Sequence, residues 1–303
     1  MIKHVLVFLK GLAMGAADVV PGVSGGTIAF ITGIYDQLLS SINSLNLKTL
    51  KMLRTDGLKA TWQHVNGTFL VALFAGIAVS IFSLARVFKH LLEHHPHLVW
   101  AFFFGLVLGS IYLVSRMVGK WNVATVAGAI VGTLISYYLT IIQPGGEATE
   151  SWFIFLSGAI AVCAMILPGV SGSFLLLILG VYYPMLDAVS NMDLVFIALL
   201  GSGAVIGILS FSRFLKYVLD NYYDMTVAIL LGFLIGSLNK LWPWKETIST
   251  RLNSHGVEVP FIQENISPVG IENPETGWVT LLVLSGIVII VVLSRFTPDE
   301  EKS

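Results

Sequence analysis

The sequence has few charged residues and a single cysteine. Charged side chains make up 12% of the 303 residues and hydrophobic ones 55%, and the mean hydropathy is +0.84. Soluble domains carry about 25% charged residues, so this composition excludes an ordinary soluble enzyme. The net charge of −1 excludes the basic surface that nucleic-acid binding needs. One thiol, Cys163, permits neither an internal disulfide nor a thiolate metal site.

The motifs of common enzymes are also missing. The sequence has no Gly-rich phosphate-binding loop with a lysine and no His-Glu-x-x-His pair. We therefore expect a protein that is not an enzyme and that uses no cofactor and no metal ion.

What the sequence has instead is a series of long uncharged runs. They are residues 19–35, 66–85, 98–115, 121–146, 151–186, 194–212 and 276–294. An α-helix needs about 20 apolar residues to cross a hydrocarbon core of about 30 Å. The runs predict an all-α polytopic membrane protein.

The chain contains an internal repeat. Residues 21–42 and 168–189 are identical at nine of 22 aligned positions, and both segments begin with Pro-Gly-Val-Ser-Gly. Residues 70–111 and 197–238 agree at 11 of 42 positions. Matches of this kind over both halves of a chain indicate a duplicated structural unit.

Each repeat is predicted to begin with a re-entrant helical hairpin. Residues 151–186 carry no charge and would make a helix of about 54 Å at about 1.5 Å per residue, which is too long for one crossing. The Pro-Gly-Val-Ser-Gly in the middle breaks the helix, so we expect two arms that enter and leave on the same side. Such irregular backbone survives at membrane depth only where protein buries it or where it lines a cavity.

Three crossings follow each hairpin, and an odd number turns the second repeat upside down relative to the first. The predicted crossings are residues 67–90, 98–118, 122–142, 193–217, 225–243 and 277–296. Two inverted repeats, each a re-entrant hairpin plus about three transmembrane helices, are typical of secondary transporters. Their sites form where broken helices from both halves meet.

We assign the first repeat to residues 1–142 and the second to residues 143–303. The first holds a hairpin over 5–42, a cytoplasmic linker over 43–66 and three crossings. The second holds a hairpin over 152–190, three crossings and an extracytoplasmic loop over 245–276. With both termini in the cytoplasm, twelve Lys and Arg face inside and five face outside, and this excess decides the orientation.

The hairpin tips are the predicted substrate site. A serine in each tip can cap the helix that follows, and the glycines beside it leave backbone N–H groups uncovered. A helix N-terminus carries about half a positive charge, so two such tips predict an anionic substrate such as a phosphate or carboxylate. A plain turn of the chain is the alternative for each tip. The candidate residues are Ser24, Gly25, Gly26 and Thr27 in the first tip, and Ser171, Gly172 and Ser173 in the second.

Three charged residues within the apolar segments are further candidates. Arg86 and Arg213 occupy the same place in the two repeats, and a planar guanidinium suits phosphate. Snorkelling to the membrane surface is the alternative for both. Asp18 lies inside the first hairpin arm, where a carboxylate is costly and is a functional candidate by default. It is the candidate for coupling to an ion such as H⁺ or Na⁺, and pairing with an arginine is the alternative.

These motifs resemble a known family. Residues 10–27, Lys-Gly-Leu-Ala-Met-Gly-Ala-Ala-Asp-Val-Val-Pro-Gly-Val-Ser-Gly-Gly-Thr, and the second Leu-Pro-Gly-Val-Ser-Gly-Ser at 167–173 are similar to the bacterial polyprenyl-phosphate transporters of the PopT type. The resemblance covers essentially the whole chain. It implies a multi-pass protein of the bacterial cytoplasmic membrane. It also implies movement of undecaprenyl phosphate, the lipid carrier of cell-wall synthesis, from the outer to the inner leaflet. The lipid nature of the substrate comes from the resemblance alone.

The expected mechanism is alternating access without covalent chemistry. The first tip and Arg86 would receive the phosphate while the tail stays in lipid, and rocking of one repeat would pass it to the second tip and Arg213. Two alternatives stay open: a secondary transporter of a small soluble anion, and a membrane enzyme that acts on lipid phosphates. The expected partners are the polyprenyl phosphate and the bilayer, with a coupling ion and without nucleic acid.

Overall fold

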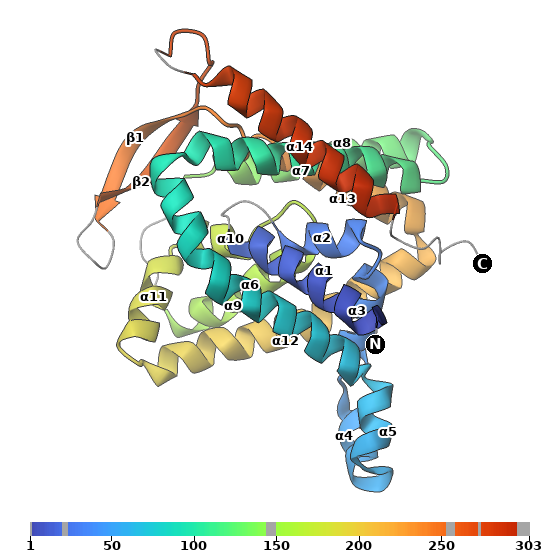
Figure 1. Ribbon diagram of the computed structural model, residues 1–303. Helices are drawn as coiled ribbons and strands as arrows, with labels where there is room; N and C mark the ends of the chain where they lie inside the picture. Colours follow the sequence, from blue (N-terminus) through green and yellow to red (C-terminus); the bar gives the residue numbers. More distant parts are fainter. Residues whose placement is uncertain (1, 20–23, 144–149, 253–257, 272–273, 296–303) are drawn as a thin grey trace.

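The computed structural model describes the chain except residues 1, 20–23, 144–149, 253–257, 272–273 and 296–303. Pro21, Gly22 and Val23 of the first hairpin motif therefore lie outside the described residues, and so does the side chain of Arg86. The described part is almost entirely helical and has one pair of strands (Figure 1).

The elements follow the predicted repeat order. In the first half they are α1 (Ile2–Val19), α2 (Gly25–Ile31), α3 (Tyr35–Asn43), α4 (Leu47–Thr55), α5 (Gly57–His64), α6 (Gly67–His94), α7 (Pro96–Met117) and α8 (Val123–Ile141). In the second half they are α9 (Ser151–Ile166), α10 (Gly172–Ile178), α11 (Tyr182–Ser190), α12 (Leu194–Asn221), α13 (Tyr223–Ser237), β1 (Lys245–Leu252), β2 (Glu258–Asn265) and α14 (Thr276–Arg295). Helices α1–α3 and α6–α8 thus correspond to α9–α11 and α12–α14, while α4 and α5 have no counterpart.

The prediction of a polytopic helical membrane protein is confirmed. Five described helices, α6, α7, α8, α12 and α14, are long and apolar enough to cross a membrane. Each lies within a few residues of a predicted crossing. Helix α13 is apolar but has 15 residues, so it ends before the limit expected for the crossing over 225–243. The inversion of the second repeat stays a prediction.

The second arm of each hairpin differs from the prediction. It consists of two short helices, α2 and α3 or α10 and α11, rather than one continuous helix. The α10–α11 pair is bent by 104°. The breaks fall at Gly33 and Gly180, whose φ angles of 68° and 72° are strained for any residue with a side chain. The repeat alignment pairs these two glycines, so the sequence contained the signal for the bend.

The helices pack in matching pairs. Helix α1 packs on α6 in the first half of the chain. The equivalent helices of the second half, α9 and α12, pack on each other in the same way. Helix α7 packs on α14 and α13 packs on α8, so in these pairs each half contributes one helix. The equivalence of the pairs is the structural counterpart of the sequence repeat.

Paired glycines allow two of these helix pairs to approach closely. A Cβ on Gly158 or Gly203 would lie well under 3.0 Å from a carbonyl oxygen of the partner helix, where α9 crosses α12. Their repeat equivalents, Gly11 and Gly76, lie in the same way between α1 and α6. Small residues at helix interfaces let membrane proteins gain van der Waals packing without a hydrophobic driving force.

Gly203→Ala is expected to destabilise the protein, whereas Gly201→Ala is not. A methyl group added at position 203 would meet the carbonyl of Phe155, and overpacking of this kind costs about 1–3 kcal/mol. Position 201, on the same helix, is surrounded by open space. The thermal unfolding midpoints of the two variants in detergent measure the difference. Equal midpoints would contradict the close contact of α9 with α12.

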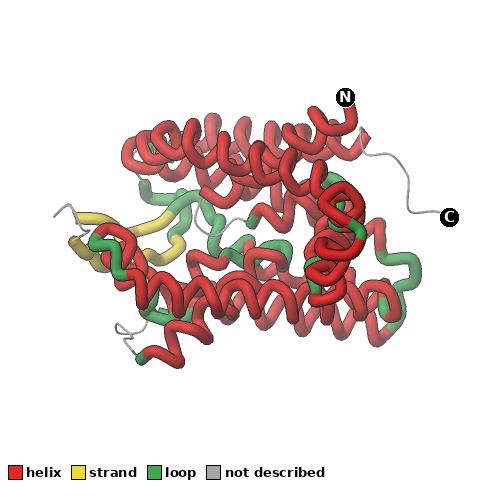
Figure 2. The backbone as a smooth tube through the Cα atoms, turned by 90° about the horizontal axis from the view of Figure 1, so that it is seen from below, coloured by secondary structure: helices red, strands yellow, loops and turns green. Residues whose placement is uncertain are grey.

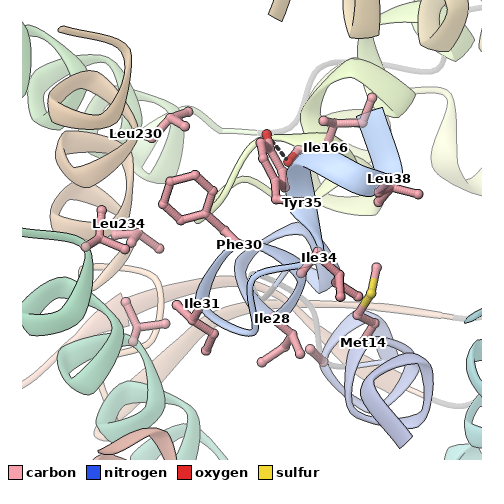
Figure 3. Close-up of a cluster of buried hydrophobic side chains, with 14 of the residues drawn as sticks. Met14, Ile28, Phe30, Ile31, Ile34, Tyr35, Leu38, Ile166, Leu230 and Leu234 are labelled. Atoms are coloured by element: carbon pink, nitrogen blue, oxygen red, sulfur yellow. Dashed lines mark hydrogen bonds between the residues drawn. The ribbon is translucent and has the colours of Figure 1, made fainter. Parts of the chain in front are cut away.

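The main core joins the first hairpin to the second repeat. Phe30 and Ile31 of α2 are buried in one hydrophobic cluster with Leu230 and Leu234 of α13 (Figure 3). Helix α2 is buried along its whole length. The first hairpin is therefore fixed by packing as well as by its connection to α1.

One end of the molecule carries the pair of strands, and the other carries the start of α1 and the end of α14. Figures 1 and 2 show β1 and β2 at the end opposite to the start of α1 and the end of α14. The strands pair antiparallel within the predicted extracytoplasmic loop over 245–276, for which the sequence analysis gave no strands. Helices α4 and α5 project from the body in the segment predicted as a linker (Figure 1). The start of α1 and the end of α14 thus lie on one side, as the predicted topology requires.

Candidate functional site

The tips of the two hairpins meet. The hydroxyl of Ser24 donates to the carbonyl oxygens of Met165 and Leu167, at 3.0 and 3.2 Å. The amide of Gly169 donates to Thr27 Oγ1 at 3.0 Å. The structure thus brings together the breaks of both hairpins, although the bonded residues are 141 to 143 positions apart in the sequence.

Close backbone contact tightens this junction. A Cβ on Gly26 would lie against the carbonyl oxygens of Met165 and Ile166, so a side chain at this position would push the tips apart. Tyr35, at the start of α3, donates its hydroxyl to the Ile166 carbonyl at 3.0 Å (Figure 3). Two glycine-rich tips can therefore touch through main-chain atoms, which a pair of ordinary helix ends could not do.

At the first tip a side-chain carboxylate occupies the helix N-terminus. Ser24 caps α2 by accepting from the amide of Gly26 at 3.1 Å. The carboxylate of Asp18 accepts from the amide of Gly25 at 2.7 Å. The amide of Thr27 donates to the carbonyl oxygen of Ser24. Asp18 therefore takes the place that a substrate anion would take at a helix N-terminus.

The second tip has no such carboxylate, because Met165 aligns with Asp18 in the repeat. Ser171 caps α10, and its hydroxyl shares a hydrogen bond of 3.0 Å with that of Ser173. Among the described residues, the amides of Gly172 and Ser173 have no acceptor. The second tip is thus the one whose backbone amides are free to donate hydrogen bonds to a substrate.

A small cavity at the second tip contains a lysine that the sequence analysis did not select. Its walls include Gly169, Ser171 and Lys240, and Lys240 lies between α13 and β1. By the predicted topology this lysine lies on the outer side, against the inside excess of positive charge. That exception was the signal that could have singled it out.

The two candidate arginines lie on the equivalent helices α6 and α12. Arg213 is exposed, and no hydrogen bond or ion pair joins it to another described residue. Its neighbour Ser212 donates to the side chain of Asn43 at 2.7 Å, so this part of α12 contacts the first hairpin rather than the second tip. Arg86 belongs to α6, and its side chain lies outside the described residues. A phosphate-binding role for either arginine stays a prediction.

Residues 14–259, which include both hairpin tips, match a family model described as undecaprenyl phosphate translocase-like. The chain belongs to this family. It is 46% identical over 294 residues to a polyprenyl-phosphate transporter of Vibrio cholerae serotype O1, and the match covers 96% of each chain. It is 35% identical over 254 residues to a polyprenyl-phosphate transporter of Staphylococcus aureus, covering 78% of this chain and 85% of that one. No solved structure matches it significantly.

Membership of the undecaprenyl phosphate translocase-like family confirms the resemblance found in the two Pro-Gly-Val-Ser-Gly motifs. Both relatives are named transporters, and five described helices are long enough to cross a membrane. The protein is therefore a multi-pass membrane protein of a family in which both of these relatives are named as transporters.

Proposed function

We propose that this protein moves a polyprenyl phosphate between the leaflets of the bacterial cytoplasmic membrane. The observation that carries the proposal is the junction of the two hairpin tips, made by Ser24 and Thr27, in a chain related to polyprenyl-phosphate transporters. Broken helices that meet between two repeats form the substrate sites of secondary transporters. The same architecture needs no nucleophile and no covalent intermediate.

The phosphate is the part of the lipid that needs the protein. A phosphate monoester carries about −1.5 to −2 charges near neutral pH, and an ion of this kind is costly to move through hydrocarbon. The hydroxyls of Ser171 and Ser173 and the free amides of the second tip would replace its water. The polyprenyl tail beyond its first part stays in lipid. Rocking of one repeat against the other then exposes the shared site first to one leaflet and then to the other.

Asp18 makes the two tips unequal and is the proposed coupling residue. While its carboxylate accepts from Gly25, that amide is not available to a phosphate. Binding of a proton or a sodium ion to Asp18 would weaken this hydrogen bond and free the first tip. Ion binding to Asp18 would in this way let the phosphate move from the second tip to the first tip. The residues that would bind it there are Ser24, Gly25, Gly26 and Thr27.

The proposed direction is from the outer to the inner leaflet. We place the start of α1 and the end of α14 in the cytoplasm, because that orientation puts twelve Lys and Arg inside and five outside. The strands then face outside, and so does the second hairpin with its free donors. The lipid would enter at the second tip and leave past the first. This order is the reverse of the one expected from the sequence, because Asp18 occupies the amide of Gly25 at the first tip.

Replacing both arginines, Arg86→Ala with Arg213→Ala, is expected to slow transport about tenfold, because two guanidinium groups that could attract the phosphate are lost, while solvent screens the exposed Arg213. Initial rates of leaflet exchange in proteoliposomes measure the change. Arg116→Ala, an exposed arginine at the end of α7, is the matched control. Undiminished transport by the double variant would remove the arginines from the mechanism.

Binding measurements separate this function from its alternatives. The protein in nanodiscs is titrated with undecaprenyl phosphate, undecaprenol and inorganic phosphate, and the lipid is recovered and analysed afterwards. We expect preferential binding of undecaprenyl phosphate and its unchanged recovery. Equally tight binding of inorganic phosphate would favour a transporter of small soluble anions. Release of phosphate from the lipid would show an enzyme.

A further inference from the structure

Two lysines near the second hairpin tip have no acidic partner in the part of the chain that the structure describes. Lys240, between α13 and β1, and Lys245, the first residue of β1, are both partly buried. Every ion pair found among the described residues involves other cations. Burying a cation without a counter-charge costs stability, so a chain that keeps one there is a candidate for binding an anion.

Aromatic rings and a backbone oxygen hold the two ammonium groups. Lys240 Nζ lies 4.4 Å from the centroid of the Phe174 ring, which belongs to α10. Lys245 Nζ lies 4.0 Å from the centroid of the Trp100 ring and donates to the carbonyl oxygen of Lys240 at 2.5 Å. Such contacts stabilise a cation but leave its net charge uncompensated.

The environment disfavours the charged form of Lys245. Burial, together with repulsion from Lys240, lowers the pKa of Lys245 well below its usual value. A bound anion would act in the opposite direction, because a nearby opposite charge favours the protonated form. The site as it stands is therefore short of negative charge.

Lys240 shares its cavity with the tip itself. Gly169 and Ser171 line the same cavity, whose volume of about 20 Å³ admits a water molecule. A larger anion would enter when the Lys240 side chain turns away from Phe174, which lines the same cavity. The Lys240 ammonium group is thus placed to contact an anion as it enters or leaves the second tip.

An open pocket of about 630 Å³ is lined in part by residues that flank Lys240 in the sequence, and more of its lining residues are apolar than polar. Phe104, Trp242 and Ile266 are among its lining residues, and so is Asn239, the neighbour of Lys240. Apolar side chains beside a cationic site match a ligand with a charged head and a hydrocarbon chain. A free anion would make no use of the apolar side chains in this wall.

We propose that Lys240 and Ser171 bind the phosphate group of a polyprenyl phosphate at the second hairpin tip, with Lys245 as a second positive charge beside them. This site rests on the proposed function, for which it supplies the residues that receive the substrate from the outside. The ligand is a phosphate monoester on an apolar chain, and the pocket around Trp242 takes the first part of that chain.

Calorimetric titration of the protein in nanodiscs with farnesyl phosphate tests the site. Lys240→Gln is expected to weaken binding about tenfold or more, because a charge-assisted contact to phosphate is lost. Lys240→Arg keeps the charge and is expected to keep most of the affinity. Lys120→Gln, which removes an exposed lysine between α7 and α8, is the control and should bind as the wild type does.

Lys240→Met separates binding from folding. Loss of an unpaired, partly buried cation should leave the thermal midpoint unchanged or raise it, while the affinity for farnesyl phosphate falls. Wild-type affinity in both Lys240→Gln and Lys240→Met would overturn the lysine site and leave the proposed function standing. A wild type that binds farnesol as tightly as farnesyl phosphate would overturn the proposed function too. Inorganic phosphate binding as tightly as farnesyl phosphate would overturn the role of the apolar wall.

Discussion

Gly26→Ala is expected to slow transport about tenfold to a hundredfold, because overpacking at a main-chain contact costs about 1–3 kcal/mol. The added methyl group would press on the carbonyl oxygens of Met165 and Ile166, and the two hairpin tips would have to separate. The hydrogen bonds that Ser24 and Thr27 make across the junction would lengthen with them. Initial rates of leaflet exchange in proteoliposomes measure the loss.

Three further variants show whether a loss of transport comes from the junction. Gly277→Ala, at the start of α14, adds the same methyl group in open space and should transport normally. Thr27→Val keeps the shape of the side chain but leaves the Gly169 amide without its acceptor, so it should also slow transport, whereas Thr27→Ser should not. Normal transport by Gly26→Ala would mean that the tips need not touch.

Asp18→Asn is expected to lower transport driven by an ion gradient about a hundredfold, which corresponds to about 2.7 kcal/mol in the barrier. The amide oxygen of asparagine can still accept from Gly25, and asparagine is a good capping residue, so the helix end itself should be kept. What the variant loses is the negative charge that would bind a proton or a sodium ion. Transport rates with and without an imposed gradient of each ion measure the effect.

Asp36→Asn is the matched control for this experiment. Asp36 lies on the same hairpin and forms an exposed ion pair with Lys216 at 2.5 Å, and exposed pairs contribute little. It should transport at nearly the wild-type rate. If Asp18→Asn responds to the gradient as the wild type does, Asp18 is a capping residue and not the coupling residue.

Much of this fold could be predicted from the sequence because the bilayer restricts what a chain can do. Uncharged runs located five described spanning helices to within a few residues, since a helix must match the thickness of the hydrocarbon. The repeat alignment located both hairpin tips, since the shared Pro-Gly-Val-Ser-Gly motif combines a helix-breaking proline with flexible glycines. The strands β1 and β2 were missed because they lie outside the apolar segments, where this constraint does not act.

The candidate site could be predicted only in part. Main-chain groups at the tips follow from the local motif, and the structure brings the two motifs together. That the carboxylate of Asp18 contacts Gly25 depends on the fold of the tip, which no spacing rule fixes. Lys240 was missed for the same reason, because it reaches Phe174 from a segment 66 positions further along the chain (240 minus 174).

The central claim is that the junction of the two hairpin tips carries a lipid phosphate across the bilayer. The most direct test is leaflet exchange of a fluorescent undecaprenyl phosphate in proteoliposomes, with the label in the outer leaflet destroyed by a reagent that does not enter the vesicles. We predict rapid exchange with the wild type, slow exchange with Gly26→Ala, and no acceleration for the same lipid without its phosphate. An exchange rate for undecaprenyl phosphate equal to that of protein-free vesicles would contradict the account.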